Sequence, residues 1–205
     1  MMISPNLRLF RWVMLFATLG ILLIHGCCNR SDNKNNNSTD YNPVAEELNQ
    51  YLNWSRLQLP GSKGFVYDGD NPYQQSLVKR GRDVVDYINA NQAKLITPAN
   101  QYEIIWLLGE IADPNAFQLL LTLYRQSPDY RTAISLAACT SIEKIDTLIN
   151  ALNDKELVVL MDSILSEADK NATQGLTRIE IINYWKTNYD SIRRTVLQKT
   201  KPLLG

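Results

Sequence analysis

Apolar residues recur at every third or fourth position along most of the chain after its first forty residues, which places them on one face of an α-helix. No stretch alternates apolar and polar residues for long, as a half-buried strand would. The pattern begins at Asn42-Pro43, where an N-cap residue precedes a proline suited to a first helical turn, and continues with Val44 and Leu48. The sequence therefore predicts an all-α fold over residues 43–205.

Turn-forming residues divide this region into separate helices. The turn-rich segment 59–72 interrupts the pattern, and further helices are expected at Asn71-Pro72, Thr97-Pro98, Asp113-Pro114 and Ser127-Pro128. A single helix is predicted to follow Asn71-Pro72, with apolar positions at Leu77, Val84, Ile88 and Leu95. Capping boxes are predicted at Thr140/Glu143, Asn153/Glu156 and Thr177/Glu180. The last box is expected to open one long helix, with apolar residues at Ile181, Trp185, Tyr189, Ile192 and Val196.

The helix that follows Thr97-Pro98 is apolar on both faces and is predicted to be buried between its neighbours. Trp106 on this helix is therefore expected to be enclosed. Gly109 costs about 0.5–1 kcal/mol in the middle of a helix, and close backbone contact with an adjacent helix is the expected compensation.

Helices joined by tight capped turns, with a period of roughly 30 residues, are typical of a helical solenoid. The string "IIWLLGEIADPNAFQLLLTLY", residues 104–124, resembles the helix–turn–helix core of HEAT-like repeats, in which Leu-Gly-x-Ile-Gly-Asp-Pro-x-Ala joins two helices. Residues 130–152 are similar to a degenerate second copy, and 153–200 to an atypical closing pair. The resemblance implies a short right-handed solenoid. Ala112 stands where the family has Gly, so this turn is expected to avoid a left-handed residue.

The N-terminus has the pattern of an export signal. Arg8 and Arg11 precede an apolar run over residues 12–24, which is closer in length to a signal-peptide core than to a membrane span. A short single-span anchor is the alternative, but no basic cluster follows the run. Ile24-His25-Gly26-Cys27 resembles the lipobox of bacterial lipoproteins. That resemblance implies removal of residues 1–26, lipidation of Cys27, and a membrane anchor facing the periplasm, on the outer membrane in preference to the inner.

Residues 27–42 are poor in apolar side chains and are predicted to form a disordered tether. Cys28 lies on this tether, whereas Cys139 lies in an apolar stretch and is predicted to be a buried small side chain. A Cys28–Cys139 disulfide is the alternative in an oxidising envelope, at the cost of pinning the tether to the core.

The charges and the single histidine limit the chemistry that we expect. Lys+Arg and Asp+Glu both number 21, which gives no electrostatic case for nucleic-acid binding. His25 is lost with the signal, so the mature chain lacks a His base or metal ligand. Glu103 and Glu110 share a helix face but are too far apart to form an acid–base pair. We expect no catalytic residue, no metal site and no cofactor.

A protein-binding surface is the remaining expectation. Tyrosine and arginine are favoured at interface hot spots, and the candidate residues are Tyr124, Arg125, Tyr130, Arg131, Arg193 and Arg194. The leading hypothesis is a lipid-anchored, cell-envelope interaction module without catalytic activity. Alternatives are a periplasmic immunity or inhibitor protein, a passive structural lipoprotein, and an enzyme resembling the bilin lyases, which contain HEAT-like repeats.

Overall fold

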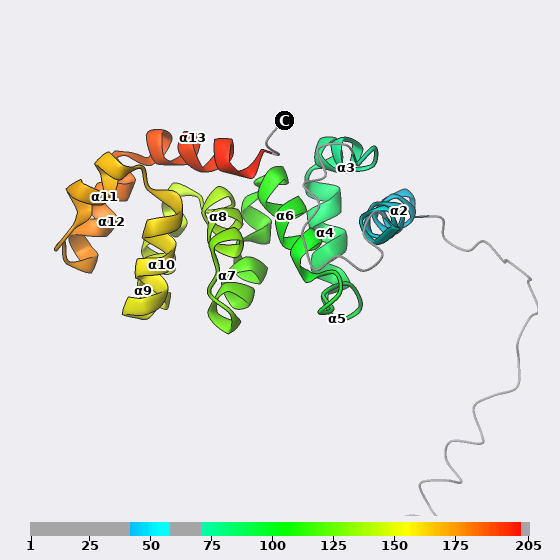
Figure 1. Cartoon of the computed structure of the whole chain (residues 1–205), viewed down its shortest axis with the longest axis horizontal. Helices are drawn as coiled ribbons and strands as arrows, with labels where there is room; N and C mark the ends of the chain where they lie inside the picture. Colours follow the sequence, from blue (N-terminus) through cyan, green and yellow to red (C-terminus); the bar gives the residue numbers. More distant parts are fainter. Residues whose placement is uncertain (1–41, 58–70, 202–205) are drawn as a thin grey trace, which may run out of the picture. The chain divides into compact units, whose positions relative to one another are not determined.

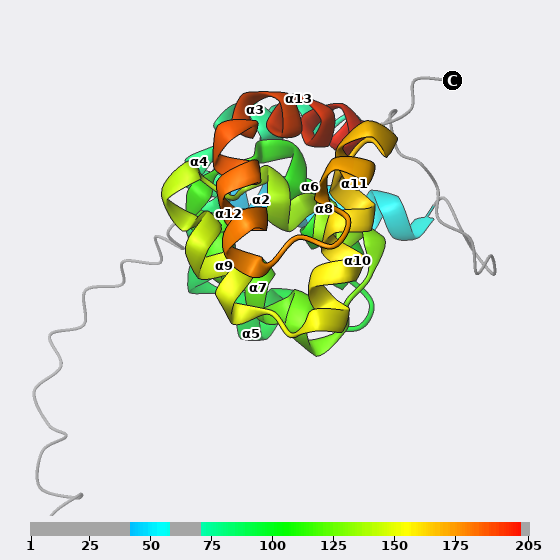
Figure 2. The same ribbon diagram turned by 90° about the vertical axis from the view of Figure 1, so that its left-hand side faces the viewer.

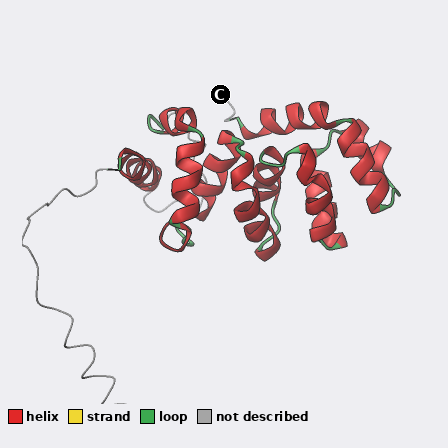
Figure 3. Ribbon diagram, turned by 180° about the vertical axis from the view of Figure 1, so that it is seen from behind, coloured by secondary structure: helices red, strands yellow, loops and turns green. Residues whose placement is uncertain are grey.

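The computed structural model describes residues 42–57 and 71–201, which are helical and contain no strand (Figure 1, Figure 3). The all-α prediction is confirmed for these residues. The predicted signal segment, Cys27, Cys28 and most of the tether lie outside them. The α-helices are α2 (Pro43–Leu57), α3 (Gln74–Arg80), α4 (Arg82–Ala90), α5 (Gln92–Leu95), α6 (Gln101–Ile111), α7 (Phe117–Gln126), α8 (Tyr130–Ala138), α9 (Ile145–Ala151), α10 (Asp154–Ile164), α11 (Glu167–Thr173), α12 (Arg178–Thr187) and α13 (Tyr189–Thr200). Short 3-10 helices, η1 (Pro114–Ala116) and η2 (Ile142–Lys144), lead into α7 and α9.

Local signals set the start of the first helices. Asn42 caps α2 as predicted, because its Oδ1 accepts hydrogen bonds from the backbone N–H groups of Val44 and Ala45 at 3.0 and 3.2 Å. The single helix predicted after Asn71-Pro72 is wrong. It is divided into α3, α4 and α5: Gly81 at φ 53° separates α3 from α4, and Asn91 separates α4 from α5. The four apolar positions predicted for it are nevertheless all buried.

The close approach predicted at Gly109 is confirmed where α6 crosses α8. A Cβ atom placed on Gly109 would lie 2.9 Å from the Cα and 2.8 Å from the Cβ of Ser135. Only a glycine lets the two backbones come this near. Trp106 differs from the prediction, because its side chain is half-buried and therefore not enclosed by neighbouring helices. The buried residues of α6 are Ile104, Ile105, Leu107, Leu108 and Gly109.

The turn after α6 overturns a second expectation. Ala112 adopts the left-handed conformation, with φ 54° and ψ 32°, and its N–H donates to the Leu108 carbonyl at 3.0 Å. The chain therefore keeps the turn that a glycine would favour and carries an alanine in it. This conformation costs a non-glycine residue about 1–2 kcal/mol. Asp113 follows and accepts a hydrogen bond from the Asn115 N–H at 2.8 Å, which fixes the start of η1.

Helix pairs recur along the middle of the chain. A 3-10 turn followed directly by an α-helix appears at Pro114 and Phe117 and again, at the same offset in residue number, at Ile142 and Ile145. α8 packs against α6 on one side and α10 on the other, and α7 also packs on α8, while α9 packs against α12 (Figure 1, Figure 2). The core lies between these helices.

The predicted caps differ in outcome. The boxes at Asn153/Glu156 and Thr177/Glu180 are both formed. The box at Thr140 and Glu143 is absent, because Thr140 Oγ1 instead donates to the Leu136 carbonyl at 2.8 Å. The cap of α8 is also shifted: Asp129, rather than Ser127, accepts from the N–H groups at the start of the helix.

The long final helix predicted from Thr177 onward is wrong. The chain bends at Asn188, so that α12 and α13 are separate helices. α13 turns back over the middle of the fold and packs mainly against α8, with further contacts to α6 and α10 (Figure 1). Ile192 and Val196 of α13 are buried in this packing, and each is 1% exposed. Burial of this apolar face provides the physical reason for the bend.

Candidate interaction surface

One of the predicted interface residues, Tyr124, lies inside the protein. Its side chain is 0% exposed, and its hydroxyl donates to the Glu156 carbonyl at 2.6 Å. Burial, followed by the nearby Glu156 carboxylate, raises the pKa of this hydroxyl, which therefore stays protonated. The residue continues the inward-facing stripe of α7 that includes Phe117 and Leu120. Tyr124 thus ties α7 to α10, and its assignment to a partner-binding surface is corrected.

Three predicted residues remain at the turn between α7 and α8. Arg125 is exposed in the last turn of α7, and Tyr130, the first residue of α8, is 55% exposed. Arg131 is half-buried. Asp129 between them accepts hydrogen bonds from the N–H groups of Arg131 and Thr132 and so fixes where α8 begins. Tyr130 is therefore an exposed aromatic residue at a capped helix start, with Arg131 next to it in sequence, and both are residue types favoured at protein interfaces.

Tyr102 on the neighbouring helix α6 is also exposed. It lies in the first turn of α6 and is 42% exposed. α6 and α8 contact each other through their C-terminal halves, where Gly109 meets Ser135. Tyr102 and Tyr130 therefore lie at the equivalent, N-terminal ends of two adjacent helices. Burial of both faces is predicted for this helix, and the exposure of Tyr102 in its first turn is an exception to that prediction.

The two predicted arginines of α13 have different surroundings. Arg194 is exposed. Arg193 is half-buried, and its Nη1 donates to the Ala138 carbonyl at 3.0 Å and to the Tyr189 hydroxyl at 3.3 Å. Tyr189 in turn donates to the Thr140 carbonyl at 3.0 Å. Arg193 thus binds the C-terminal end of α8, where backbone carbonyls lack helical partners and attract a positive charge.

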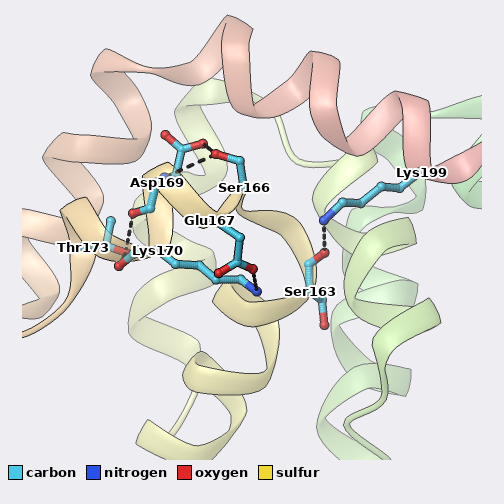
Figure 4. Close-up of polar contacts among 7 residues, drawn as sticks. All are labelled: Ser163, Ser166, Glu167, Asp169, Lys170, Thr173 and Lys199. Atoms are coloured by element: carbon cyan, nitrogen blue, oxygen red, sulfur yellow. Dashed lines mark hydrogen bonds and ion pairs between the residues drawn. The ribbon is translucent and has the colours of Figure 1, made fainter.

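A polar junction joins the C-terminal helices (Figure 4). Lys199 on α13 donates through Nζ to the Ser163 carbonyl at 2.7 Å, near the end of α10. Burial, followed by the positive charge of Lys170, lowers the pKa of Lys199. Lys170 itself forms an ion pair with Glu167 at 2.9 Å within α11. Lys199 therefore adds a second contact between α13 and a helix C-terminus.

Asp169 connects α11 to α12 at the same junction. Its carboxylate accepts hydrogen bonds from the hydroxyls of Ser166 and Tyr184, both at 2.6 Å. The hydrogen bond from the Ser166 side chain, followed by that from Tyr184, lowers the pKa of Asp169. The Ser166 hydroxyl also caps α11 by accepting from the Asp169 N–H. These hydrogen bonds hold α11 and α12 together.

Glu110, which shares a helix face with Glu103, carries a half-buried carboxyl group. Gln74 on α3 donates through Nε2 to its Oε2 at 2.5 Å, and the Trp106 side chain also forms a hydrogen bond with it. Burial outweighs these bonds and raises the pKa of Glu110. Glu103 instead offers its backbone carbonyl to the Tyr51 hydroxyl at 3.4 Å. The two carboxyl groups thus have separate surroundings.

Cys139 is fully buried, as predicted, and its Sγ donates to the Leu108 carbonyl at 3.3 Å. Burial raises the pKa of this thiol to about 12. It is a free thiol in the structure. Among residues 42–57 and 71–201, no group of His, Cys, Asp and Glu side chains is placed to hold a metal ion.

Comparison with known proteins adds no relative. No protein-family model matches the chain, and no curated protein and no solved structure matches it significantly. Within the part of the chain that the structure describes, no helix is long and apolar enough to cross a membrane.

Proposed function

We propose that this protein is a lipid-anchored, cell-envelope interaction module built of HEAT-like helix pairs in a short right-handed solenoid, without catalytic activity of its own. The N-terminal pattern supports an anchor at Cys27, followed by the polar tether. The accessible residues at the N-terminal ends of α6 and α8 support the binding role. Their arrangement, with Tyr130 and Tyr102 exposed on adjacent helices and Arg125 exposed at the turn before α8, is the observation that carries the proposal.

An affinity pull-down from detergent-solubilised membranes tests the binding role. The full chain should recover one stoichiometric protein partner, and the double variant Arg125→Ala/Tyr130→Ala should lose it. Removal of one hot-spot residue costs about 2 kcal/mol or more, which corresponds to roughly 30-fold in affinity. Lys94→Ala, which changes an exposed cation on α5, is the matched control and should retain the partner. Equal recovery by the double variant and the control would contradict this surface.

The anchor is tested separately by Cys27→Ser. This variant should lose lipid labelling and accumulate as an unprocessed precursor, while wild type partitions with membranes. Normal processing of the variant by ordinary signal peptidase would rule out the lipoprotein assignment.

A further inference from the structure

The bend between α12 and α13 is concentrated at one residue. Asn188 has φ −103° and ψ 17°, with a helix ending immediately before it and another beginning immediately after it. Helical hydrogen bonds reach it from both sides, because its N–H donates to the Tyr184 carbonyl and its carbonyl accepts from the Ile192 N–H, both at 3.0 Å. No glycine or proline occurs between residues 178 and 200. The local sequence therefore does not require a bend here.

At the bend, three backbone N–H groups lack the helical hydrogen bonds that they would form in a continuous helix. The first three N–H groups of α13, those of residues 189–191, precede its first helical hydrogen bond, and Asn188 supplies no side-chain cap to them. In an unbroken helix, the carbonyls of residues 185–187 would accept these three N–H groups. The apolar positions of α12 and α13 also follow one continuous helical spacing. Local energetics thus favour a straight helix through Asn188.

Each side of the bend has its own attachment to the rest of the fold. α12 is fixed to α9, because Arg178 donates to the carbonyls of Ile149 and Leu152 at 2.6 and 2.8 Å and Lys186 pairs with Asp146 at 2.6 Å. α13 is fixed separately to α8, α6 and α10. Its contacts are the buried Ile192 and Val196 and the side-chain hydrogen bonds of Tyr189, Arg193 and Lys199 to backbone carbonyls.

We propose that the surface of α6, α8 and α10 beneath α13 is a docking site for α13 of a second copy of this chain. Straightening at Asn188 carries α13 away from its own docking site and makes α12 and α13 one helix. The two copies then exchange α13 and fill both sites, which gives a closed, symmetric dimer. The contacts of α13 with α6, α8 and α10 are retained in the dimer, including the bonds to the C-terminal ends of α8 and α10, whereas those with α12 across the bend are lost. Monomer and dimer differ chiefly at the hinge, which gains three backbone hydrogen bonds on straightening.

Two substitutions at Asn188 test the exchange. Asn188→Ala and Asn188→Gly both remove the hydrogen bond from Nδ2 to the Tyr184 carbonyl at 2.9 Å. They differ in helix propensity by about fivefold per chain in favour of alanine, and a dimer contains two hinges, so the dimer association constant should differ by about 25-fold. The measurement is the protein mass of the full chain in detergent micelles, by size-exclusion chromatography with light scattering over a concentration series. Circular dichroism of each variant verifies that it is folded.

The expected result is a dimer in wild type at high concentration, with more dimer in Asn188→Ala and less in Asn188→Gly. A dimer of equal strength in both variants would overturn the proposal, because it would form through another surface. A mass corresponding to monomer at every concentration in folded Asn188→Ala would also overturn it.

Discussion

Replacing Ala112 with glycine should stabilise the protein, although the change removes a methyl group. Ala112 is the non-glycine residue with positive φ among the described residues, and its left-handed conformation costs about 1–2 kcal/mol relative to glycine. Glycine gives back part of this advantage, because it increases the conformational entropy of the unfolded chain by about 0.4–1 kcal/mol. The methyl group is only partly buried. The net expectation for Ala112→Gly is a gain of about 0.5–1 kcal/mol in the free energy of unfolding.

Urea unfolding followed by circular dichroism measures this difference. The matched control is Ala172→Gly, an exposed position inside α11, where glycine should lower stability by about 0.5–1 kcal/mol. The two alanine-to-glycine changes are therefore predicted to have opposite signs. If Ala112→Gly lowers stability as much as Ala172→Gly, the left-handed turn after α6 is refuted.

Three further changes probe other parts of the fold. Gly109→Ala should destabilise the protein by about 1–3 kcal/mol, because the added methyl group meets the backbone of Ser135, and unchanged urea unfolding would contradict the α6–α8 crossing. Tyr124→Phe removes a hydrogen bond and should lower the free energy of unfolding by about 1 kcal/mol, whereas Arg125→Ala at an exposed position should lower it by less than about 0.5 kcal/mol. Equal losses in the two variants would contradict the burial of Tyr124 and the exposure of Arg125. Glu110 has a raised pKa in the folded state, so its contribution to stability is present below its unfolded pKa and is lost as pH rises through the folded value. Glu110→Gln should remove this part of the pH dependence, which unfolding measured from pH 4 to 8 would detect. An unchanged pH profile would count against the partial burial of this carboxyl group.

The sequence determined most features that depend on neighbours along the chain. The caps at Asn42, Asn153 and Thr177 were predictable because each side chain binds an N–H group two or three residues away. The close contact at Gly109 was predictable because a glycine inside an apolar helix needs a compensating interaction. Helical periodicity identified the buried apolar positions of α3, α4 and α5 even where it missed the breaks between them.

Tertiary structure decided which of two helix faces reaches the solvent. Helical spacing alone did not show that Tyr124 is buried whereas Arg125 is exposed. It also predicted that Trp106 is enclosed, although this side chain is half-buried. Among the candidate interface residues, the exposure of Tyr130 and the tie between Arg193 and α8 likewise depend on segments distant in the sequence. A periodic pattern records that a face is apolar, but it does not record how far the neighbouring helix covers that face.

The bend at Asn188 shows the same division at the level of a whole helix. The sequence from Thr177 to Val196 has the period, the cap and the composition of one helix, and it contains no residue that breaks one. The structure nevertheless ends α12 and folds α13 back onto α8. Local propensity differs by only about 1 kcal/mol or less per residue among ordinary residues. Fully burying a side chain such as Ile192 or Val196 contributes about 1.5–3 kcal/mol, so the long-range contacts override the local preference.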